Sequence, residues 1–265
     1  MNQIQKELAG KSGGSPVFIF GNGPSLQLFD LSKTKNSVTI ASNAFIKNSA
    51  AISACELNFI VASDAAVYFG PSTLAKLFLN DLSERLSSNN HLFFVYPLNF
   101  HQILHFNIPA SLHSQLIPVP RYNNKSLTAL RDHFELTDIG NTLNTILLPL
   151  SLLFSKTIIL VGFDGIGSPA VKGSVTANYQ WSYSDAFSYG TYSKSTRLFE
   201  PGFTNEHKKM IDNGTYTDIY FGNDFENNLA HLEDQGYQIF SVNRSTVPSI
   251  EKRFNPILAE NYLAH

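Results

Sequence analysis

The sequence predicts an α/β fold in which helices cover both faces of a mostly parallel β-sheet. Short runs rich in β-branched and aromatic residues alternate along the 265 residues with longer segments of helical periodicity. Several of these runs are apolar on both faces, which is typical of strands that helices cover from two sides. The first run ends in a glycine-containing turn, the kind of position where open α/β sheets bind ligands. We therefore expect a binding site at the carboxyl ends of the strands.

The predicted elements follow from composition and periodicity. Strands are predicted at residues 17–20, 37–41, 57–62, 91–96, 116–119, 157–161 and 237–242. Helices are predicted between them at residues 72–86, 99–106, 127–134, 141–154 and 225–235. Pro149 lies inside the fourth helix, where it has no N–H to donate, so this helix is kinked or its bounds differ.

The chain divides into a short leading segment and one domain. Residues 11–16 are Lys-Ser-Gly-Gly-Ser-Pro, so residues 1–16 are predicted to be a flexible N-terminal segment and residues 17–265 the domain. Residues 165–216 are rich in Gly, Ser, Tyr and Thr and have no sustained periodicity. A segment this long inside a compact domain is typical of a lid over a site. A variable surface insertion is the alternative.

The composition is that of a globular protein, with 43% hydrophobic and only 15% charged residues. A formal net charge of −2 offers no general attraction to a polyanion, so nucleic acid is not an expected partner. Cys55 is the only cysteine, which excludes an intrachain disulfide and agrees with a reducing cytoplasm. Because no run resembles a signal peptide or a bilayer-spanning helix, we expect a cytoplasmic protein. Peripheral attachment at the inner face of the membrane and homo-oligomerisation stay open.

The turn after the first predicted strand reads Gly21-Asn22-Gly23-Pro24-Ser25. Its glycines permit unusual backbone conformations, and exposed N–H groups there, with the side chains of Asn22 and Ser25, are suited to a phosphate or nucleotide. The turn is not a dinucleotide fingerprint, because Leu26 stands where the third glycine is required. A plain tight turn is the alternative.

Other predicted strands also end in polar residues. Asn43 and Asp64 follow the next two strands, so that with the glycine turn three early strands end in polar residues, which a shared crevice explains better than separate caps; Asp164 follows a fourth strand. We expect Asn43 and Asp64 to contact a sugar, base or ribose. Asn141 and Thr142 begin the fourth predicted helix, where they either present an anion site or simply cap the helix.

These blocks resemble a known enzyme family. The Gly-Asn-Gly-Pro-Ser turn, Asn43, residues 141–164 and residues 216–245 are similar to the bacterial sialyltransferases of glycosyltransferase family 42. They are similar as well to a related Rossmann-like domain of unknown function, found in flagellin-modification proteins and in an archaeal pterin diphosphokinase. The resemblance implies a Rossmann-like fold, a single-domain variant of the GT-A type, with a lid segment.

The resemblance also implies which residues bind the donor. Asn22 and Asn43 match two asparagines that contact the CMP-sugar, whereas Asp64 stands at the position of a third. The family's Thr-Ser pair before the central helix falls on Asn141 and Thr142. Ile139 replaces the arginine that precedes this pair, which counts against recognition of a sialic acid carboxylate.

The family's general base is a lid histidine, and His207 is its counterpart here, with an exposed surface histidine as the alternative. A histidine suits this step because its pKa lies near neutrality. Tyr189, Tyr192 and Tyr216 are the candidates for the lid tyrosines that stabilise the donor phosphate. The other histidines are scattered in sequence and are expected to be structural or surface residues: His91, His101, His105, His113, His133, His231 and His265.

The predicted function is therefore inverting, metal-independent transfer of a CMP-activated, sialic-acid-like sugar to a surface glycan such as lipopolysaccharide or capsule. The expected partners are the nucleotide-sugar donor and the glycan acceptor, with no cofactor; no Asp-x-Asp or cysteine cluster suggests a metal site. One alternative is diphosphotransfer from ATP, with magnesium held by Asp64 and Asp164. The other is a non-catalytic nucleotide-sugar-binding module.

Overall fold

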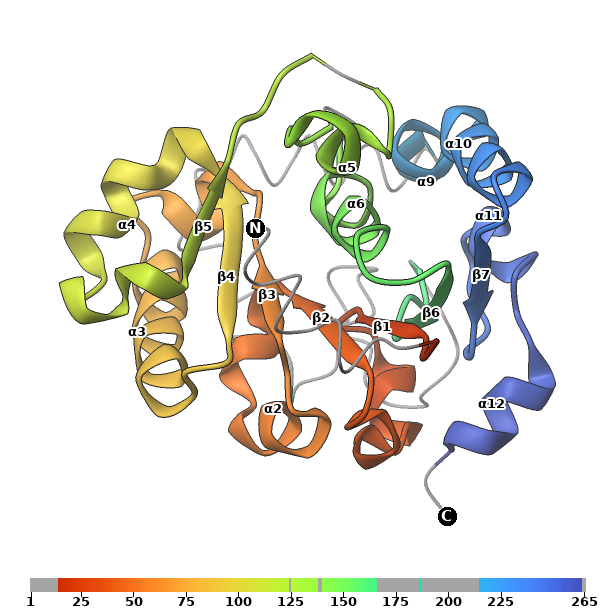
Figure 1. The fold of residues 1–265 in the computed structure, drawn as a ribbon, viewed down its shortest axis with the longest axis horizontal. Helices are drawn as coiled ribbons and strands as arrows, with labels where there is room; N and C mark the ends of the chain where they lie inside the picture. The colour runs from red at the N-terminus through yellow and green to blue at the C-terminus, as the bar shows by residue number, and fades with distance from the viewer. Residues whose placement is uncertain (1–13, 124, 138–139, 166–185, 187–214, 264–265) are drawn as a thin grey trace.

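A computed structural model describes residues 14–123, 125–137, 140–165, 186 and 215–263. Its centre is one seven-stranded sheet in which every neighbouring pair is parallel (Figure 1). The strands are β1 (Val17–Phe20), β2 (Val38–Ser42), β3 (Phe59–Val61), β4 (Phe93–Pro97), β5 (Leu116–Val119), β6 (Thr157–Val161) and β7 (Gln238–Ser241). All seven predicted strands are confirmed, each within two residues at either end.

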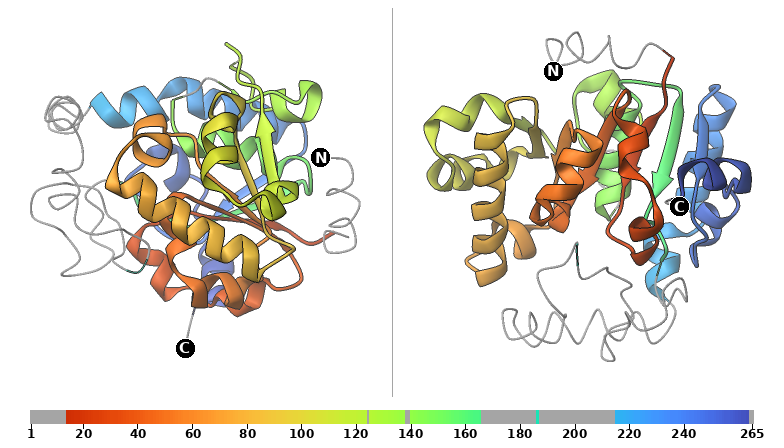
Figure 2. Two further views of the ribbon diagram at one scale, coloured as in Figure 1. Left: turned by 90° about the vertical axis from the view of Figure 1, so that its left-hand side faces the viewer. Right: turned by 90° about the horizontal axis from the view of Figure 1, so that it is seen from below.

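Helices cover both faces of the sheet, as predicted (Figures 1 and 2). The hydrophobic core has one layer on each face, because alternate strand residues point to opposite sides. Phe18 and Phe20 pack in one layer, Val17 and Ile19 in the other. The first layer contains α2 (Ser49–Cys55), α3 (Thr73–Ser88), α4 (His101–Asn107) and α12 (Pro256–Tyr262). The second contains α5 (Ala129–His133), α6 (Leu148–Ser151), α10 (Asn223–Asp234) and α11 (Pro248–Glu251).

Short helical turns and one further helix complete the described elements. The turns are η1 (Pro24–Leu28), η2 (Leu31–Thr34), η3 (Asn43–Lys47), η4 (Ala65–Phe69), η5 (Leu98–Phe100), η6 (Ala110–Gln115) and η7 (Leu143–Leu147), and the helix is α9 (Thr215–Phe221). The predicted helices at 72–86 and 225–235 correspond to α3 and α10, whereas α2, α9, α11 and α12 were not predicted. Each of these four has at most seven residues, too few for a sustained hydrophobic period.

The predicted helix at residues 141–154 is present in a modified form. It consists of η7, a wider π-helical turn, followed by α6. Pro149 has no N–H to donate to the carbonyl of Thr145, and the N–H of the preceding residue, Leu148, donates to the carbonyl of Leu143, five residues back. The proline thus changes the helix in the way its position suggested.

The strand order is β5-β4-β3-β2-β1-β6-β7. The chain first builds the sheet outward from β1 to β5 and then crosses to the other side of β1 to add β6 and β7. The direction of winding therefore reverses between β1 and β6, and open α/β sheets commonly bind ligands at such a point, outside the carboxyl ends of the strands. Because all strands are parallel, these ends share one edge.

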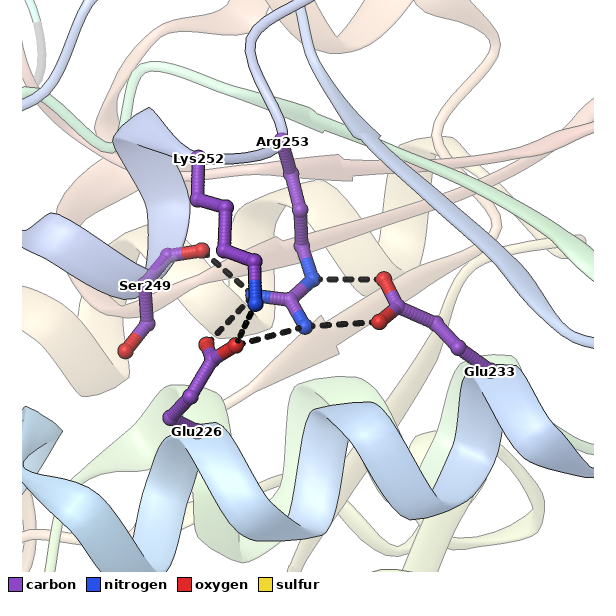
Figure 3. Close-up of polar contacts among 5 residues, drawn as sticks. All are labelled: Glu226, Glu233, Ser249, Lys252 and Arg253. Atoms are coloured by element: carbon purple, nitrogen blue, oxygen red, sulfur yellow. Dashed lines mark hydrogen bonds and ion pairs between the residues drawn. The ribbon is translucent and has the colours of Figure 1, made fainter.

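An ion-pair cluster joins the second-layer helices α10 and α11 (Figure 3). Arg253 follows α11, and its side chain is 4% exposed. Its guanidinium group is the centre of the cluster. It donates to both carboxylate oxygens of Glu233, over 2.7 and 2.8 Å. It also donates to Glu226 and to the Ser249 carbonyl, each over 2.6 Å. Lys252 joins from the surface, where its ammonium group donates to Glu226 over 2.6 Å.

Several predictions fall on residues that the structure leaves out. Residues 1–13 of the predicted N-terminal segment and nearly all of the predicted lid, residues 166–185 and 187–214, lie outside the described residues. The division into these segments stays a prediction. Within the described ranges, no helix is both long enough and apolar enough to cross a bilayer.

Candidate functional site

Four polar residues singled out in the sequence follow four neighbouring strands. Asp64, Asn43, Asn22 and Asp164 come after β3, β2, β1 and β6, which lie side by side in that order. Adjacent strands are about 4.8 Å apart, so neighbouring members of this row are within reach of one small ligand. The end members are three strand spacings apart, roughly 14 Å.

The glycine turn after β1 packs tightly on the loop after β6. A Cβ atom on Gly21 would overlap the carbonyl oxygen of Gly162, and one on Gly23 would overlap the Asp164 carboxylate. The N–H groups of Gly21 and Gly23 donate to the carbonyls of Val161 and Gly162, over 2.7 and 2.9 Å. Glycine is thus required at both positions for the two loops to touch, because a larger side chain would overlap the β6 loop.

Asp164 and Ser25 complete this loop contact. Asp164 is 1% exposed, and its carboxylate accepts the Ser25 hydroxyl over 2.8 Å and the Ser25 N–H over 3.3 Å. Burial raises the pKa of the Asp164 carboxyl, and the bonds from Ser25 partly offset this effect. The expectation of a phosphate cradle is therefore wrong for the N–H groups of Gly21, Gly23 and Ser25, since all three donate within the protein.

Asn22 and Asn43 each have a buried amide oxygen without a donor. Asn22 is 6% exposed, and its Nδ2 donates to the Ser42 carbonyl over 3.2 Å. Its Oδ1 and that of Asn43 are buried and have no hydrogen-bond partner in the described part of the chain. Asn43 also has a left-handed backbone with φ of 54°. A buried acceptor left unpaired costs about 1–3 kcal/mol, so both oxygens are suited to a ligand that brings N–H or O–H donors.

Asp64 and Thr142 lie at the β3 end of the same edge. One Asp64 oxygen accepts the Val67 N–H over 3.2 Å at the start of η4. The hydroxyls of Ser63 and Thr142 are 3.0 Å apart, which joins the end of β3 to the start of η7. In such a pair one hydroxyl hydrogen is used and the other is free to donate elsewhere. The structure therefore brings Thr142 to Ser63, the residue before Asp64, although the two are far apart in sequence.

Asn141 has the capping role that was left open. Its Oδ1 accepts the Asn144 N–H over 3.0 Å, and its Nδ2 donates to the Tyr220 carbonyl over 3.1 Å. An anion site on that N–H group is not available, because the Asn141 side chain already occupies it. Asn141 thus closes the helix start and ties it to α9.

Asn144 is a site residue that the sequence analysis missed. It is fully buried, its Nδ2 donates to the Tyr220 carbonyl over 2.9 Å, and its Oδ1 has no partner among the described residues. Gly140, with φ of 72°, lets the Tyr220 ring approach, since a Cβ there would lie 2.7 Å from it. These contacts dock α9, whose first turn contains Tyr216, onto the start of η7. The only sequence signal was a polar residue inside an apolar helix.

The remaining predicted residues cannot be placed in the site. His207, Tyr189 and Tyr192 lie outside the described residues, and the structure describes no side chain for Tyr216. Within the described ranges, no group of three or more His, Cys, Asp or Glu residues is arranged to hold a metal ion. The magnesium ion shared by Asp64 and Asp164 stays a prediction; the Asp164 carboxylate already accepts two hydrogen bonds from Ser25.

Comparison with known proteins gives matches among solved structures alone. No family model matches the chain, and no curated protein sequence matches it. The structural matches are sialyltransferases. The crystal structure of CstII in complex with CMP matches with a TM-score of 0.45 and 15% identity, over 94% of this chain and 85% of that one. CstII with a trisaccharide acceptor and CMP, and CstII from Campylobacter jejuni with a substrate analogue, match with TM-scores of 0.43 and 14% identity, over 86% of this chain and 80% and 81% of theirs.

This likeness names the class of enzyme that the sequence blocks resemble.

Proposed function

We propose that this chain is a glycosyltransferase that takes its sugar from a CMP-activated, sialic-acid-like donor. The observation that carries the proposal is the pair of buried amide oxygens of Asn22 and Asn43, at adjacent strand ends, with no donor in the described part of the chain. A nucleoside supplies such donors through its ribose hydroxyls, and cytosine adds an exocyclic amino group. The resemblance of the sequence blocks to family 42 supports CMP as the nucleotide.

The β3 end of the edge is suited to the phosphate. Between them, the paired hydroxyls of Ser63 and Thr142 have one O–H that is not used in their own contact. A phosphate oxygen accepts such a hydrogen bond, whereas Asp64 repels a phosphate and is better suited to a sugar hydroxyl. The nucleoside would thus lie over β1 and β2, with its phosphate toward Thr142.

In the proposed reaction, an acceptor hydroxyl attacks the anomeric carbon of the donor sugar. The bond from that carbon to the phosphate oxygen breaks, and CMP leaves with the electron pair. The hydroxyl proton passes to a general base, for which the resemblance nominates His207. Attack opposite the leaving group inverts the anomeric centre. The acceptor would be a surface glycan or its lipid-linked precursor, and no cofactor is part of this scheme.

A thermal-shift panel of CMP, CDP, UDP, GDP and ATP tests the nucleotide first. At a concentration 100 times the dissociation constant, CMP should raise Tm by on the order of 5 °C. A magnesium-dependent response to ATP alone would favour diphosphotransfer instead.

Turnover is tested next, by the hydrolysis of CMP-linked sugars. The wild-type protein should release CMP, and His207→Ala should reduce the rate by at least about a hundredfold. If CMP stabilises the protein but no acceptor supports turnover, the protein is a non-catalytic nucleotide-sugar-binding module. Equal turnover by the variant would remove His207 from the mechanism.

A further inference from the structure

Three histidines that the sequence analysis read as scattered lie in contact. His101 and His105 are one turn apart on α4, and His113 belongs to η6. The ring centroids of His101 and His105 are 4.0 Å apart, and those of His105 and His113 are 3.9 Å apart. We call these three residues the histidine stack. Their reading as structural or surface residues stands, but the fold brings them together, since His105 of α4 meets His113 of η6.

Both outer rings are held by hydrogen bonds. Nδ1 of His101 is 2.8 Å from the hydroxyl of Tyr96, a buried residue of β4. Nε2 of His113 donates to the Ile108 carbonyl over 2.9 Å. The His105 ring is tilted by 52° against the His101 ring and by 30° against the His113 ring. In the part of the chain that the structure describes, they do not form a metal-binding group.

The central ring of the stack, that of His105, is exposed and has a lowered pKa. Desolvation and the neighbouring His101 and His113 all lower the pKa of His105. The other titratable groups on elements packed against the stack are Tyr96 of β4 and, on α3, Lys76, Asp81, Glu84 and Arg85. None of these contributes to the shift of His105, and η5 and β5 contain no titratable residue.

We propose that the histidine stack is a pH-sensitive joint, which holds α4 against η6 while the central His105 ring is neutral and releases it when that ring becomes charged. A histidine whose folded pKa is lowered binds fewer protons in the packed state than in the open state. The packed state is thus fully favoured above the ordinary histidine pKa of about 6.5 and loses stability as the pH falls below it.

The opening should be local. Helix α4 lies at the outer end of the sheet, beside β4 and β5, while the candidate site lies at the ends of β1, β2 and β3 (Figure 1). The stack therefore changes the edge of the molecule without dismantling the row of strand ends. The proposal does not depend on the identity of the substrate.

Hydrogen exchange of the α4 amides measures the joint directly. After correction for intrinsic exchange, the protection of residues 104–108 should fall on the order of tenfold between pH 7.5 and pH 5.5. His105→Gln removes the central charge, and His105→Phe removes the charge but keeps a stacking ring, so both variants should lose this pH response. His231→Gln on α10, far from the stack in sequence, is the matched control and should keep it.

Protection that does not change between the two pH values would overturn the proposal, as would an unchanged response in His105→Phe. A rise in Tm with Zn²⁺ at pH 7.5 that requires all three histidines would overturn it too, because the stack would then be a metal site. The pH response of the wild type, lost in both His105 variants and kept in His231→Gln, supports the joint.

Discussion

At the scale of single residues, the site depends on acceptors rather than on the donors first expected. The glycine turn uses three N–H groups to hold the β6 loop. Among the described residues, the buried amide oxygens of Asn22, Asn43 and Asn144 have no donor, and those of Asn22 and Asn43 lie at adjacent strand ends. Such oxygens select ligands with hydroxyl or amino hydrogens, so these two asparagines are where substitution should affect binding most.

Asn43→Gly separates binding from folding. Glycine adopts a left-handed backbone readily, so the variant should keep the stability of the wild type to within about 1 kcal/mol. Loss of one buried hydrogen bond to the ligand should weaken CMP about tenfold. Titration of CMP by calorimetry, with urea unfolding as the control, measures both quantities. A wild-type affinity in this variant would show that Asn43 does not contact the nucleotide.

The raised pKa of Asp164 predicts how the stability of the protein changes with pH. Because burial raises its folded pKa above the ordinary value of 3.8, the folded state holds a proton more tightly than the unfolded state. The stability that this residue contributes is therefore greatest at low pH and declines as pH rises through the raised pKa. Asp164→Asn should lack the decline, so the free energy of unfolding of wild type relative to the variant should fall between pH 4 and pH 7. If the free energies of unfolding of the wild type and of Asp164→Asn change with pH in the same way, the Asp164 carboxyl does not have a raised pKa.

At the scale of elements, short contacts connect helices that are distant in sequence. The amides of Asn141 and Asn144 bind the Tyr220 carbonyl and dock α9 on η7. The Arg253 cluster joins α10 to α11 (Figure 3). Burial opposes ionisation of Glu226, but Arg253 and Lys252 lower its pKa overall, so the carboxylate stays charged beside the arginine.

Arg253→Met should cost roughly 3 kcal/mol in the free energy of unfolding, because it leaves two partly buried glutamates without their shared partner. Lys252→Met is the matched control: the lysine side chain is 68% exposed, and its loss should cost less than about 1 kcal/mol. Urea unfolding at pH 7 compares the two. Equal costs would mean that the burial of Arg253 adds nothing to its ion pairs.

At the scale of the whole molecule, the strand order decides which polar residues meet. Ligands commonly bind where the winding reverses, which here is between β1 and β6. That place is closed by the contact of Gly21 and Gly23 with the β6 loop. Two acceptors without a donor among the described residues, those of Asn22 and Asn43, lie instead at the ends of β1 and β2. The candidate site therefore lies on the β3 side of the point where the winding reverses, and Thr142 contacts Ser63 there.

The sequence by itself determined the seven strands, the α/β class and the polar residues at the strand ends. Strands and the longer helices depend on side-chain patterns within about ten residues, and these can be read directly. The row Asp64, Asn43, Asn22 was predictable to the extent that consecutive parallel strands are usually neighbours.

Only the tertiary structure decided which of these polar groups remain for a ligand. The pairing of Ser25 with Asp164, of Asn144 with Tyr220 and of the three stacked histidines joins segments that no local pattern connects. A buried polar atom is satisfied by whatever lies beside it in space, and neighbours in space follow from the strand order and the crossovers. For this reason the residues could be named from the sequence, while their division into loop contacts and ligand contacts required the fold.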